Sequence, residues 1–292
     1  MFSISQTNLG YYCFEWTATE QGPKIIQNKF IRIKNNLNEE NTFNNIVEAF
    51  SPTLKEESNS LTVVLDYSQV NISSFKIDKN ISSSYYIDWY EKNIFETEYL
   101  EAYENFYYPL VSDENNHYLI ISIKKNYKKF LFDIINKTGF NLVCLSVNLF
   151  SPATITKQIY KIKNKEDFLI WKVDKNNYHF FTYYIDDNLA AILKIKLKRN
   201  KKVDIMQEIG EPVFVNKINT FIDDYIVNKK QYSLIKKIFI YHNKSDDKSI
   251  SNFIDAEKCN IKQIDISKLF ENKTKLHMPY IENCISLREI DV

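Results

Sequence analysis

Glycine is scarce in this chain: only four of its 292 residues are glycine, whereas ordinary usage would give about twenty. The four are Gly10, Gly22, Gly139 and Gly210, and each is isolated in the sequence. The P-loop, the Rossmann dinucleotide loop and the nucleophile elbow of hydrolases each need at least two glycines within a few residues of each other. The sequence therefore excludes all three of these sites.

A surplus of either charge is also missing, because 38 basic side chains are matched by 37 acidic ones and the formal net charge is +1. Nucleic-acid binders draw most of their affinity from neutralising phosphates, so we expect no nucleic-acid partner. The hydrophobic fraction of 44% and the charged fraction of 26% are ordinary for a globular protein. The length allows one large domain or two of normal size.

Long apolar runs and closely spaced cysteines are absent as well. No apolar run reaches the length of a membrane span, about 18 residues, and residues 1–10 lack the basic and apolar parts of a signal peptide. The four cysteines lie far apart, with no C-x-x-C spacing. They are Cys13, Cys144, Cys259 and Cys284. Three of them lie in apolar contexts, which favours small core residues in a reducing compartment, and we expect a cytoplasmic protein.

Hydrophobic patterning predicts an order of elements that occurs twice, namely three strands, a helix and a further strand. In the first occurrence, residues 2–66, these elements are expected at 2–5, 11–17, 24–33, 39–54 and 61–66. In the second, residues 168–241, they are expected at 168–173, 178–185 and 189–197, in a long helical region that includes 213–225, and at 235–241. Two such halves build the duplicated ribonuclease H-like fold of actin and sugar kinases. We expect the first half at 1–160 and the second at 161–292.

An extra block of helices and strands, at about 78–150, is expected as a subdomain inserted in the first half. It contains a predicted helix at 124–136, which Gly139 should end. Ser151 is expected to cap the next helix, with Pro152 in its first turn. Further elements are expected at 70–77, 118–123, 140–147, 261–264 and 279–289, with another helix around Phe253.

Four segments of the chain resemble the PilM-like family of actin-like ATPases, which takes part in type IV pilus assembly. They are Ser3–Trp16, Tyr127–Leu149, Phe168–Phe181 and Met278–Arg288. In the family these segments hold the first phosphate turn, a helix–glycine–strand element, the second phosphate turn and the terminal helix. The resemblance implies an α/β chain with the duplicated ribonuclease H-like (actin-like ATPase) fold and a small α/β subdomain inserted in its first half.

The nucleotide-binding turns of that family are altered in this sequence. The family's first turn begins Asp-Ile-Gly, its second again carries Asp and Gly, and a Gly-Gly turn receives the adenosine. The matching positions are Ser5, Gln6, Thr7 and Asn8 in the first turn, Asp174, Lys175 and Asn176 in the second, and His242 and Asn243 in the third. Each change places a side chain where a nucleotide needs bare backbone. We therefore expect a degenerate site with no cofactor and no catalytic residue, at which ATP and Mg²⁺ bind only if the pocket is retained.

Other groups that could carry chemistry have simpler interpretations. The histidines have no metal-ligand spacing and are expected on the surface or in turns; they are His117, His179, His242 and His277. The adjacent acid pairs are expected to be solvated or to cap helices rather than to hold a cation; they are Asp186–Asp187, Asp223–Asp224 and Asp246–Asp247. We therefore expect no metal site.

Two dense clusters leave alternatives open. In the basic segment 194–202, Lys194, Lys196 and Lys198 share one face of a predicted strand. This segment is expected to be solvated, and the alternative is a patch for anionic lipid or an acidic partner. Aromatic side chains gather at 85–108. An aromatic packing layer between subdomains is expected there, and the alternative is a peptide-binding groove.

The resemblance implies a non-enzymatic scaffold, a pseudo-ATPase located in the cytoplasm at the inner face of the inner membrane. It would bind a PilN-like peptide, the cytoplasmic tail of an inner-membrane protein, in a groove beside the inserted subdomain. One alternative is a working ATPase or small-molecule kinase of the same fold, with Asp174 and Asn176 holding the metal. Another is a globular adaptor that has no connection with pili.

Overall fold

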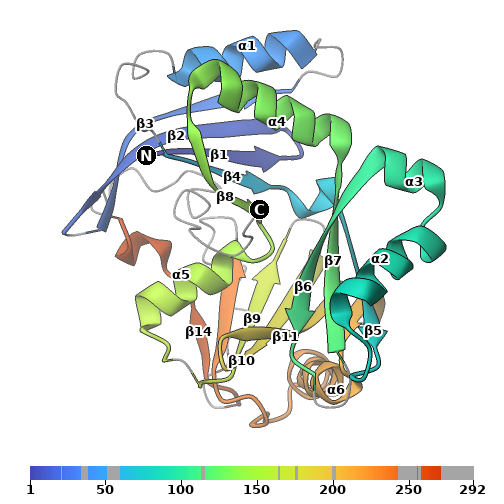
Figure 1. Cartoon of the computed structure of the whole chain (residues 1–292). Coiled ribbons are helices and arrows are strands. Elements are labelled where there is room, and N and C mark those ends of the chain that lie inside the picture. The colour runs from blue at the N-terminus through green and yellow to red at the C-terminus, as the bar shows by residue number, and fades with distance from the viewer. Residues whose placement is uncertain are drawn as a thin grey trace.

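The computed structural model describes residues 1–20, 22–33, 39–50, 60–112, 116–163, 165–174, 177–198, 202–242, 255 and 258–270 (Figure 1). The expected helices around Phe253 and at 279–289 lie outside the described residues, as do Cys284, His277 and the pair Asp246–Asp247.

A five-stranded sheet with the strand order β3-β2-β1-β4-β8 forms the first half. Its strands are β1 (Phe2–Thr7), β2 (Gly10–Thr19), β3 (Gly22–Arg32), β4 (Ser60–Leu65) and β8 (Asn141–Val147). The first three pair antiparallel, whereas β4 and β8 run parallel to β1. Helices α1 (Glu39–Phe50) and α4 (Lys125–Thr138) cover one face, and α5 (Ser151–Tyr160) lies on the other (Figure 1). Because both faces are covered, β4 is an almost uninterrupted apolar run.

A six-stranded sheet with the order β12-β11-β10-β9-β13-β14 forms the second half. Its strands are β9 (Phe168–Val173), β10 (Tyr178–Ile185), β11 (Asn188–Leu197), β12 (Val203–Gly210), β13 (Ile238–His242) and β14 (Ile261–Gln263). Helix α6 (Pro212–Phe221) continues as a π-helical turn, Ile222–Val227. Strands β9, β10 and β11 are antiparallel, and β13 pairs parallel with β9. This arrangement repeats that of β1, β2, β3 and β4, as the sequence pattern predicted.

A third, smaller sheet is inserted in the first half between β4 and α4. Its strand order is β5-β7-β6, all antiparallel. It is built from β5 (Val70–Ile77), β6 (Tyr103–Leu110) and β7 (Asn116–Lys124), with α2 (Ser83–Ile94) and α3 (Thr97–Ala102) on its outer side (Figure 1). A short 3-10 turn, Tyr67–Gln69, leads into β5. The expected insert at 78–150 also includes β8, which pairs with β4 in the first sheet. The exact division into domains stays a prediction.

Two local expectations are wrong. The region after β11 was expected to be helical, but β12 forms there as the edge strand of the second sheet. Ser151 was expected to cap α5, but the cap position is Phe150 and Ser151 is the first residue inside the helix. The end of α4 is as expected: Gly139 has a left-handed φ of 70°, and its N–H donates to the Ile135 carbonyl at 2.8 Å.

One apolar core crosses from the first half into the second. Phe180, Ile192 and Ile209 of the second sheet are buried in the same cluster as Phe2 and Ile4 of β1. A second shared cluster lies around α5 and includes residues from β2, β9 and β13. The two halves are therefore packed against each other through side chains and not only joined by the chain.

The insert has a small core made largely of aromatic rings. The Phe75 ring stacks on Tyr90 at 4.3 Å and on Tyr118 at 5.6 Å between ring centroids. These rings therefore pack within the insert rather than as a layer between subdomains, and Tyr85 and Trp89 lie on the exposed side of α2. Among the described residues, no helix is long and apolar enough to cross a membrane.

Candidate functional site

The first predicted nucleotide turn lies between β1 and β2 and is closed by its own threonine. The side chains of Ser5, Gln6 and Thr7 are buried, and Asn8 is exposed. The Thr7 Oγ1 accepts hydrogen bonds from the backbone N–H groups of Leu9 and Gly10, both at 3.1 Å, and donates to the Gly10 carbonyl at 3.1 Å. Backbone N–H groups are the donors that a phosphate-binding turn offers to its ligand. In this turn, two of them are used internally.

The glycine that remains in this turn has a structural explanation. Gly10 has a φ of 156°, and a Cβ added there would lie 2.1 Å from the backbone oxygen of Ile31 in β3. Gly10 is therefore needed for the close approach of β2 and β3. Its presence gives no indication of a ligand.

Three strand ends meet beside this turn and are joined by side chains. The Gln6 Oε1 accepts from the backbone N–H of Asp66 at 3.2 Å, just beyond the end of β4. The Asn148 side chain, just beyond β8, accepts from the N–H of Tyr67 at 3.1 Å and donates to the Asp66 carboxylate at 3.3 Å. The other Asp66 oxygen caps the short turn by accepting from the N–H and hydroxyl of Ser68 at 2.9 and 2.6 Å. The network fixes the first sheet's carboxyl edge, the usual position of ligands in such sheets.

The second half contributes a buried lysine to the same place. Lys172 lies on β9 and is only 3% exposed, and its Nζ donates to the Asn148 carbonyl at 3.0 Å. The amine is also 5.8 Å from the centroid of the Tyr67 ring, and the Lys194 amine is 5.3 Å from it. The Tyr67 ring packs edge-on against Phe180 at 4.4 Å. Hydrogen-bonded, cation–π and ring contacts therefore join the two halves here.

The contact between the halves formed by Asp66, Tyr67, Asn148 and Lys172 is called the junction. The second predicted turn, between β9 and β10, adds the carboxylate of Asp174 to it. The N–H of Asp174 donates to the Tyr178 carbonyl at 2.9 Å. Burial, together with the negative charges of Asp174 and Asp66 and a hydrogen bond with Asp174, raises the pKa of Tyr67 well above its ordinary value. His242 pairs with Val173 and so belongs to the same end of the sheet. Lys175, Asn176 and Asn243 lie outside the described residues.

Sequence reasoning missed the residues that make the junction: Asp66, Tyr67, Asn148 and Lys172. Two of them carried a usable signal, because Asp66 and Asn148 are the first polar residues after the buried parallel strands β4 and β8. Carboxyl ends of neighbouring parallel strands meet at one edge of a sheet. Lys172 is the one basic residue within an otherwise apolar strand.

Two expected surface histidines are in fact buried. His117 on β7 and His179 on β10 are almost fully covered, and the Trp171 indole N–H donates to the Nδ1 of His179 at 2.9 Å. The expectation failed because both residues lie on strands that pack between layers. Among the described residues, no group of three or more His, Cys, Asp or Glu side chains is placed to hold a metal ion.

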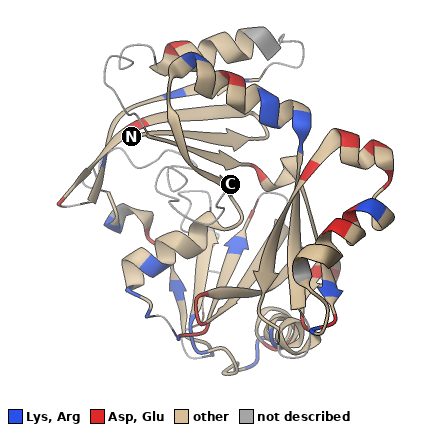
Figure 2. Cartoon of the chain, in the orientation of Figure 1, with Lys and Arg blue, Asp and Glu red and all other residues tan. Residues whose placement is uncertain are grey.

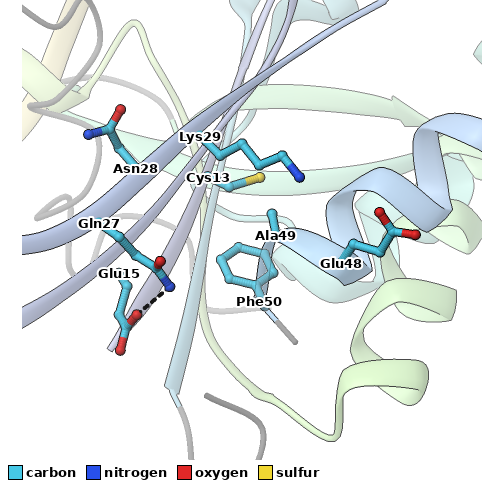
Figure 3. A pocket seen from close by; sticks show the side chains of 8 residues that line it. All are labelled: Cys13, Glu15, Gln27, Asn28, Lys29, Glu48, Ala49 and Phe50. Atoms are coloured by element: carbon cyan, nitrogen blue, oxygen red, sulfur yellow. Dashed lines mark hydrogen bonds between the residues drawn. The ribbon is translucent and has the colours of Figure 1, made fainter. Parts of the chain in front are cut away.

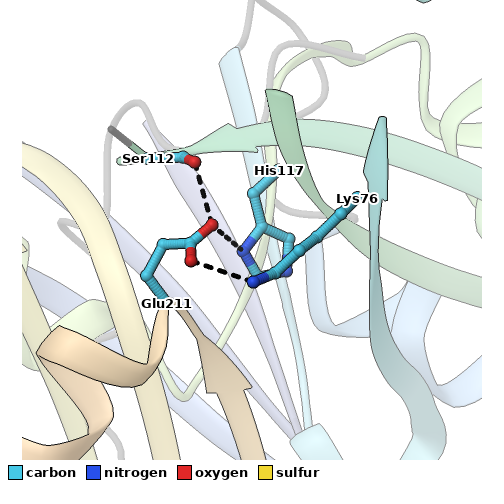
Figure 4. Close-up of polar contacts among 4 residues, drawn as sticks. All are labelled: Lys76, Ser112, His117 and Glu211. Carbon is cyan, nitrogen blue, oxygen red and sulfur yellow. Dashed lines mark hydrogen bonds and ion pairs between the residues drawn. The ribbon is translucent and has the colours of Figure 1, made fainter. Parts of the chain in front are cut away.

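Glu211, at the start of α6, joins the insert to the second half (Figure 4). Its carboxylate accepts from the Lys76 Nζ at 2.9 Å and from the Ser112 hydroxyl at 2.9 Å, and it lies 3.8 Å from the Nδ1 of His117. Burial raises the pKa of Glu211, but the hydrogen bonds from Lys76 and Ser112 and the charge of Lys76 outweigh it, so the net shift is downward. Burial and the charge of Lys76 lower the pKa of His117.

Two cavities lie away from the junction. The first, of about 270 Å³, lies between β2, β3 and the last turn of α1, and there the Gln27 amide donates to the Glu15 carboxylate at 2.6 Å (Figure 3). The second, of about 380 Å³, lies between α3 and the first turn of α4 and is lined by Glu98, Glu101 and Tyr103, among others. The second cavity is beside the insert, where the resemblance implies a peptide groove.

No protein-family model and no curated protein matches this sequence. Among solved structures, a PilM–PilN type IV pilus biogenesis complex is 10% identical, with a TM-score of 0.56, 92% of this chain covered and 89% of that chain. The cytoplasmic domain of EpsL, an inner-membrane component of the type II secretion system of Vibrio cholerae, is 10% identical, with a TM-score of 0.42. The match covers 83% of this chain and 81% of that chain. A Ppx/GppA phosphatase of Aquifex aeolicus is 8% identical, with a TM-score of 0.38. The match covers 82% of this chain and 66% of that chain.

At these identities, the similarity concerns the fold. The two halves with the same strand order, the insert in the first half and the overall similarity to the PilM chain agree with each other. The chain has the duplicated ribonuclease H-like, actin-like ATPase fold with an inserted α/β subdomain.

Proposed function

We propose that the chain is a non-catalytic scaffold of a pilus or secretion assembly, similar in role to PilM, located in the cytoplasm at the inner membrane. The observation that carries this proposal is the β1–β2 turn, where the Thr7 hydroxyl oxygen accepts hydrogen bonds from the backbone N–H groups of Leu9 and Gly10. A nucleotide would have to displace that hydroxyl. We expect that it would also have to break the hydrogen bond from the Lys172 Nζ to the backbone carbonyl of Asn148.

The polar groups at the junction are better suited to holding the halves together than to binding phosphate. The Asp66 carboxylate is committed to Ser68 and Asn148. A metal-bound triphosphate needs carboxylates with free oxygens and bare backbone around it. We therefore propose that ATP and Mg²⁺ have no site here and that the junction is structural.

A titration with ATP and Mg²⁺, read as the melting temperature, tests the nucleotide part of the proposal. A ligand at 100 times its Kd adds about 2.7 kcal/mol of stability, which would raise the melting temperature by several degrees. We expect no shift at millimolar nucleotide. A clear shift, together with hydrolysis that disappears in Asp174→Ala, would instead support the working ATPase or kinase.

We propose that the partner is a PilN-like tail, the cytoplasmic N-terminal segment of an inner-membrane protein. Support comes from the compared structure, which is a PilM–PilN complex, and from the cavity between α3 and α4, which is lined by Glu98 and Glu101 together with Lys124. Glu98 and Glu101 there could pair with basic side chains of such a tail, and Tyr103 offers an apolar surface.

A binding assay with the tails of inner-membrane proteins encoded near this chain tests the partner. The double variant Glu98→Lys with Glu101→Lys should abolish capture, because it places like charges against the tail. A matched control is Asp78→Lys with Glu20→Lys, two acidic residues outside the cavity. Equal binding by both variants, or no tail that binds the unmodified chain, would contradict the proposal.

A further inference from the structure

The insert belongs to the first half in the chain, but it is fastened to the second half in space. The backbone N–H of Val111, just after β6, donates to the Leu189 carbonyl near the start of β11 at 2.9 Å. The Gln207 side-chain amide of β12 donates to the Ile72 carbonyl of β5 at 2.5 Å. The insert therefore forms a bridge from the first half to the second.

Glu211 completes this bridge with a carboxylate that side chains of the insert surround (Figure 4). Lys76 of β5 and Ser112, after β6, each donate to it at 2.9 Å, and the Nδ1 of His117 on β7 lies 3.8 Å from it. The acidic residues of α2 and α3 lie along the outer helices of the insert (Figure 2), whereas the carboxylate at this inner contact comes from the second half. The insert supplies the donors and the second half supplies the acceptor.

Apolar packing and hydrogen bonds play different parts at this contact. Leu110 of the insert and Ile209 of β12 are buried in the same apolar cluster. Burial of apolar surface holds the parts together without fixing their orientation, because the hydrophobic effect is not directional. Hydrogen bonds weaken steeply away from their preferred angle. The bonds of Val111, Gln207 and Glu211 therefore set the orientation of the second half relative to the insert.

The insert contact lies well away from the junction on the second sheet. Lys172 of the junction is on β9, whereas Gln207 is on β12 and Glu211 directly follows that strand. Strands β9 and β12 are three places apart in the order β12-β11-β10-β9, which is about 14 Å at the usual strand spacing. Two halves held by one polar contact can turn about it, and such motion is the default between domains. A second contact at this distance opposes the turn.

We propose that the insert is a brace that fixes the angle between the two halves, with Glu211 as the residue that closes it. While the carboxylate holds Lys76 and Ser112, the second half keeps one orientation. Without that carboxylate, the second half turns about the junction, and the insert stays with the first half, to which β5 and β7 are joined through β4 and α4. This inference depends neither on the proposed partner tail nor on the nucleotide turns.

Distances between two spin labels, measured by double electron–electron resonance, test the brace in the full chain. Asn45→Cys on α1 and Lys236→Cys before β13 place one label on each half at exposed positions. Cys284→Ser keeps the labelling specific, because the other cysteines are buried. The labelled parent should give one narrow distance distribution. Glu211→Gln and Lys76→Met should each broaden it, because both remove the charged hydrogen bond at nearly constant side-chain size.

A matched control is Glu208→Gln, which makes the same charge change on β12 but removes a contact with Asn219 inside the second half. It should leave the distribution narrow. Combining Lys76→Glu with Glu211→Lys restores opposite charges and should give a narrower distribution than either substitution alone.

Amide hydrogen exchange separates a brace from a general loss of stability. Glu211→Gln should speed exchange at Val111 about tenfold more than at Val63, which is buried in β4 of the first sheet. Equal acceleration at the two amides would overturn the proposal. A distance distribution that is already broad in the labelled parent, or one that stays equally narrow in the Glu211 variant, would do the same.

Discussion

The Nζ of Lys172 donates a hydrogen bond to the backbone carbonyl of Asn148, 3.0 Å away, and the two residues belong to different halves of the molecule. A lysine with 3% exposure is rare in a protein core unless it has a partner. Here the partners are a carbonyl and the face of the Tyr67 ring. The buried amine is thus held by contacts that join the two halves.

Asn148→Ala should destabilise the protein by about 1–3 kcal/mol, because it removes the partner of the Tyr67 N–H and one partner of the Asp66 carboxylate. Urea unfolding followed by circular dichroism measures the change. Asn71→Ala is a matched control, since the Asn71 side chain is exposed and makes one long contact, 3.4 Å, with Tyr99. It should change stability by less than about 0.5 kcal/mol. Equal effects of the two substitutions would contradict a structural role for Asn148.

Gly10→Ala should be far more damaging than Gly139→Ala. At Gly10 a Cβ would lie 2.1 Å from the Ile31 oxygen, so β2 and β3 would have to separate. At Gly139 the space is open and only the left-handed φ of 70° opposes alanine, at a cost of about 1–2 kcal/mol. Thermal unfolding of the two variants makes the comparison. The explanation would fail if Gly139→Ala were the less stable of the two.

The contact around Glu211 should weaken as the pH falls. The pKa of His117 is lowered by burial and by Lys76, so His117 stabilises the fold above the unfolded value of about 6.5, and this contribution is lost as the pH falls below it. The net pKa shift of Glu211 is also downward, so its contribution is lost at lower pH, below about 4.5. Both losses therefore have the same sign.

Melting temperatures measured between about pH 3 and pH 8 test this pH dependence. His117→Gln should reduce the loss of stability just below about pH 6.5, and Glu211→Gln should reduce the loss below about pH 4.5. The difference between each variant and the unmodified chain isolates the contribution, because other groups titrate in both. Parallel curves for all three proteins would show that Glu211 and His117 do not carry the effect.

The thiols of Cys13 and Cys259 should be unreactive in the native protein. Burial raises the pKa of Cys13 to about 12 and that of Cys259 to about 11. Because the thiolate is the reacting form, iodoacetamide at pH 8 should leave both unmodified until the chain unfolds. Peptide mass mapping before and after denaturation reads each site separately. Rapid labelling of the native chain at either residue would contradict the burial.

The repeated order of elements could be predicted from sequence because it depends on local patterns. The alternation of β1, the aromatic-rich run of β2, the continuous apolar run of β4 and the stop at Gly139 are each visible within a few residues. The strand β12 could not be predicted in the same way. It is an edge strand whose burial follows no alternation, so its sequence lacks the period that identifies a half-buried strand.

The junction could be predicted only in part, because its contacts depend on sheet register. Gln6 and Asp66 are sixty residues apart, and Asp66 and Asn148 are eighty-two apart. They meet because β1, β4 and β8 pair in parallel and end at the same edge. The sequence did not indicate that these side chains would meet or that Lys172 would cross between the halves.

The apolar core that crosses the two halves has a consequence for how the molecule unfolds. Phe180 and Ile192 of the second sheet complete the packing of β1 and β4 in the first. Separating the halves would expose this shared apolar surface to water on both sides. Neither half has another surface of its own that would bury it, so separation is unfavourable. The chain should therefore melt in a single cooperative step, and either half expressed by itself should be an aggregation-prone fragment.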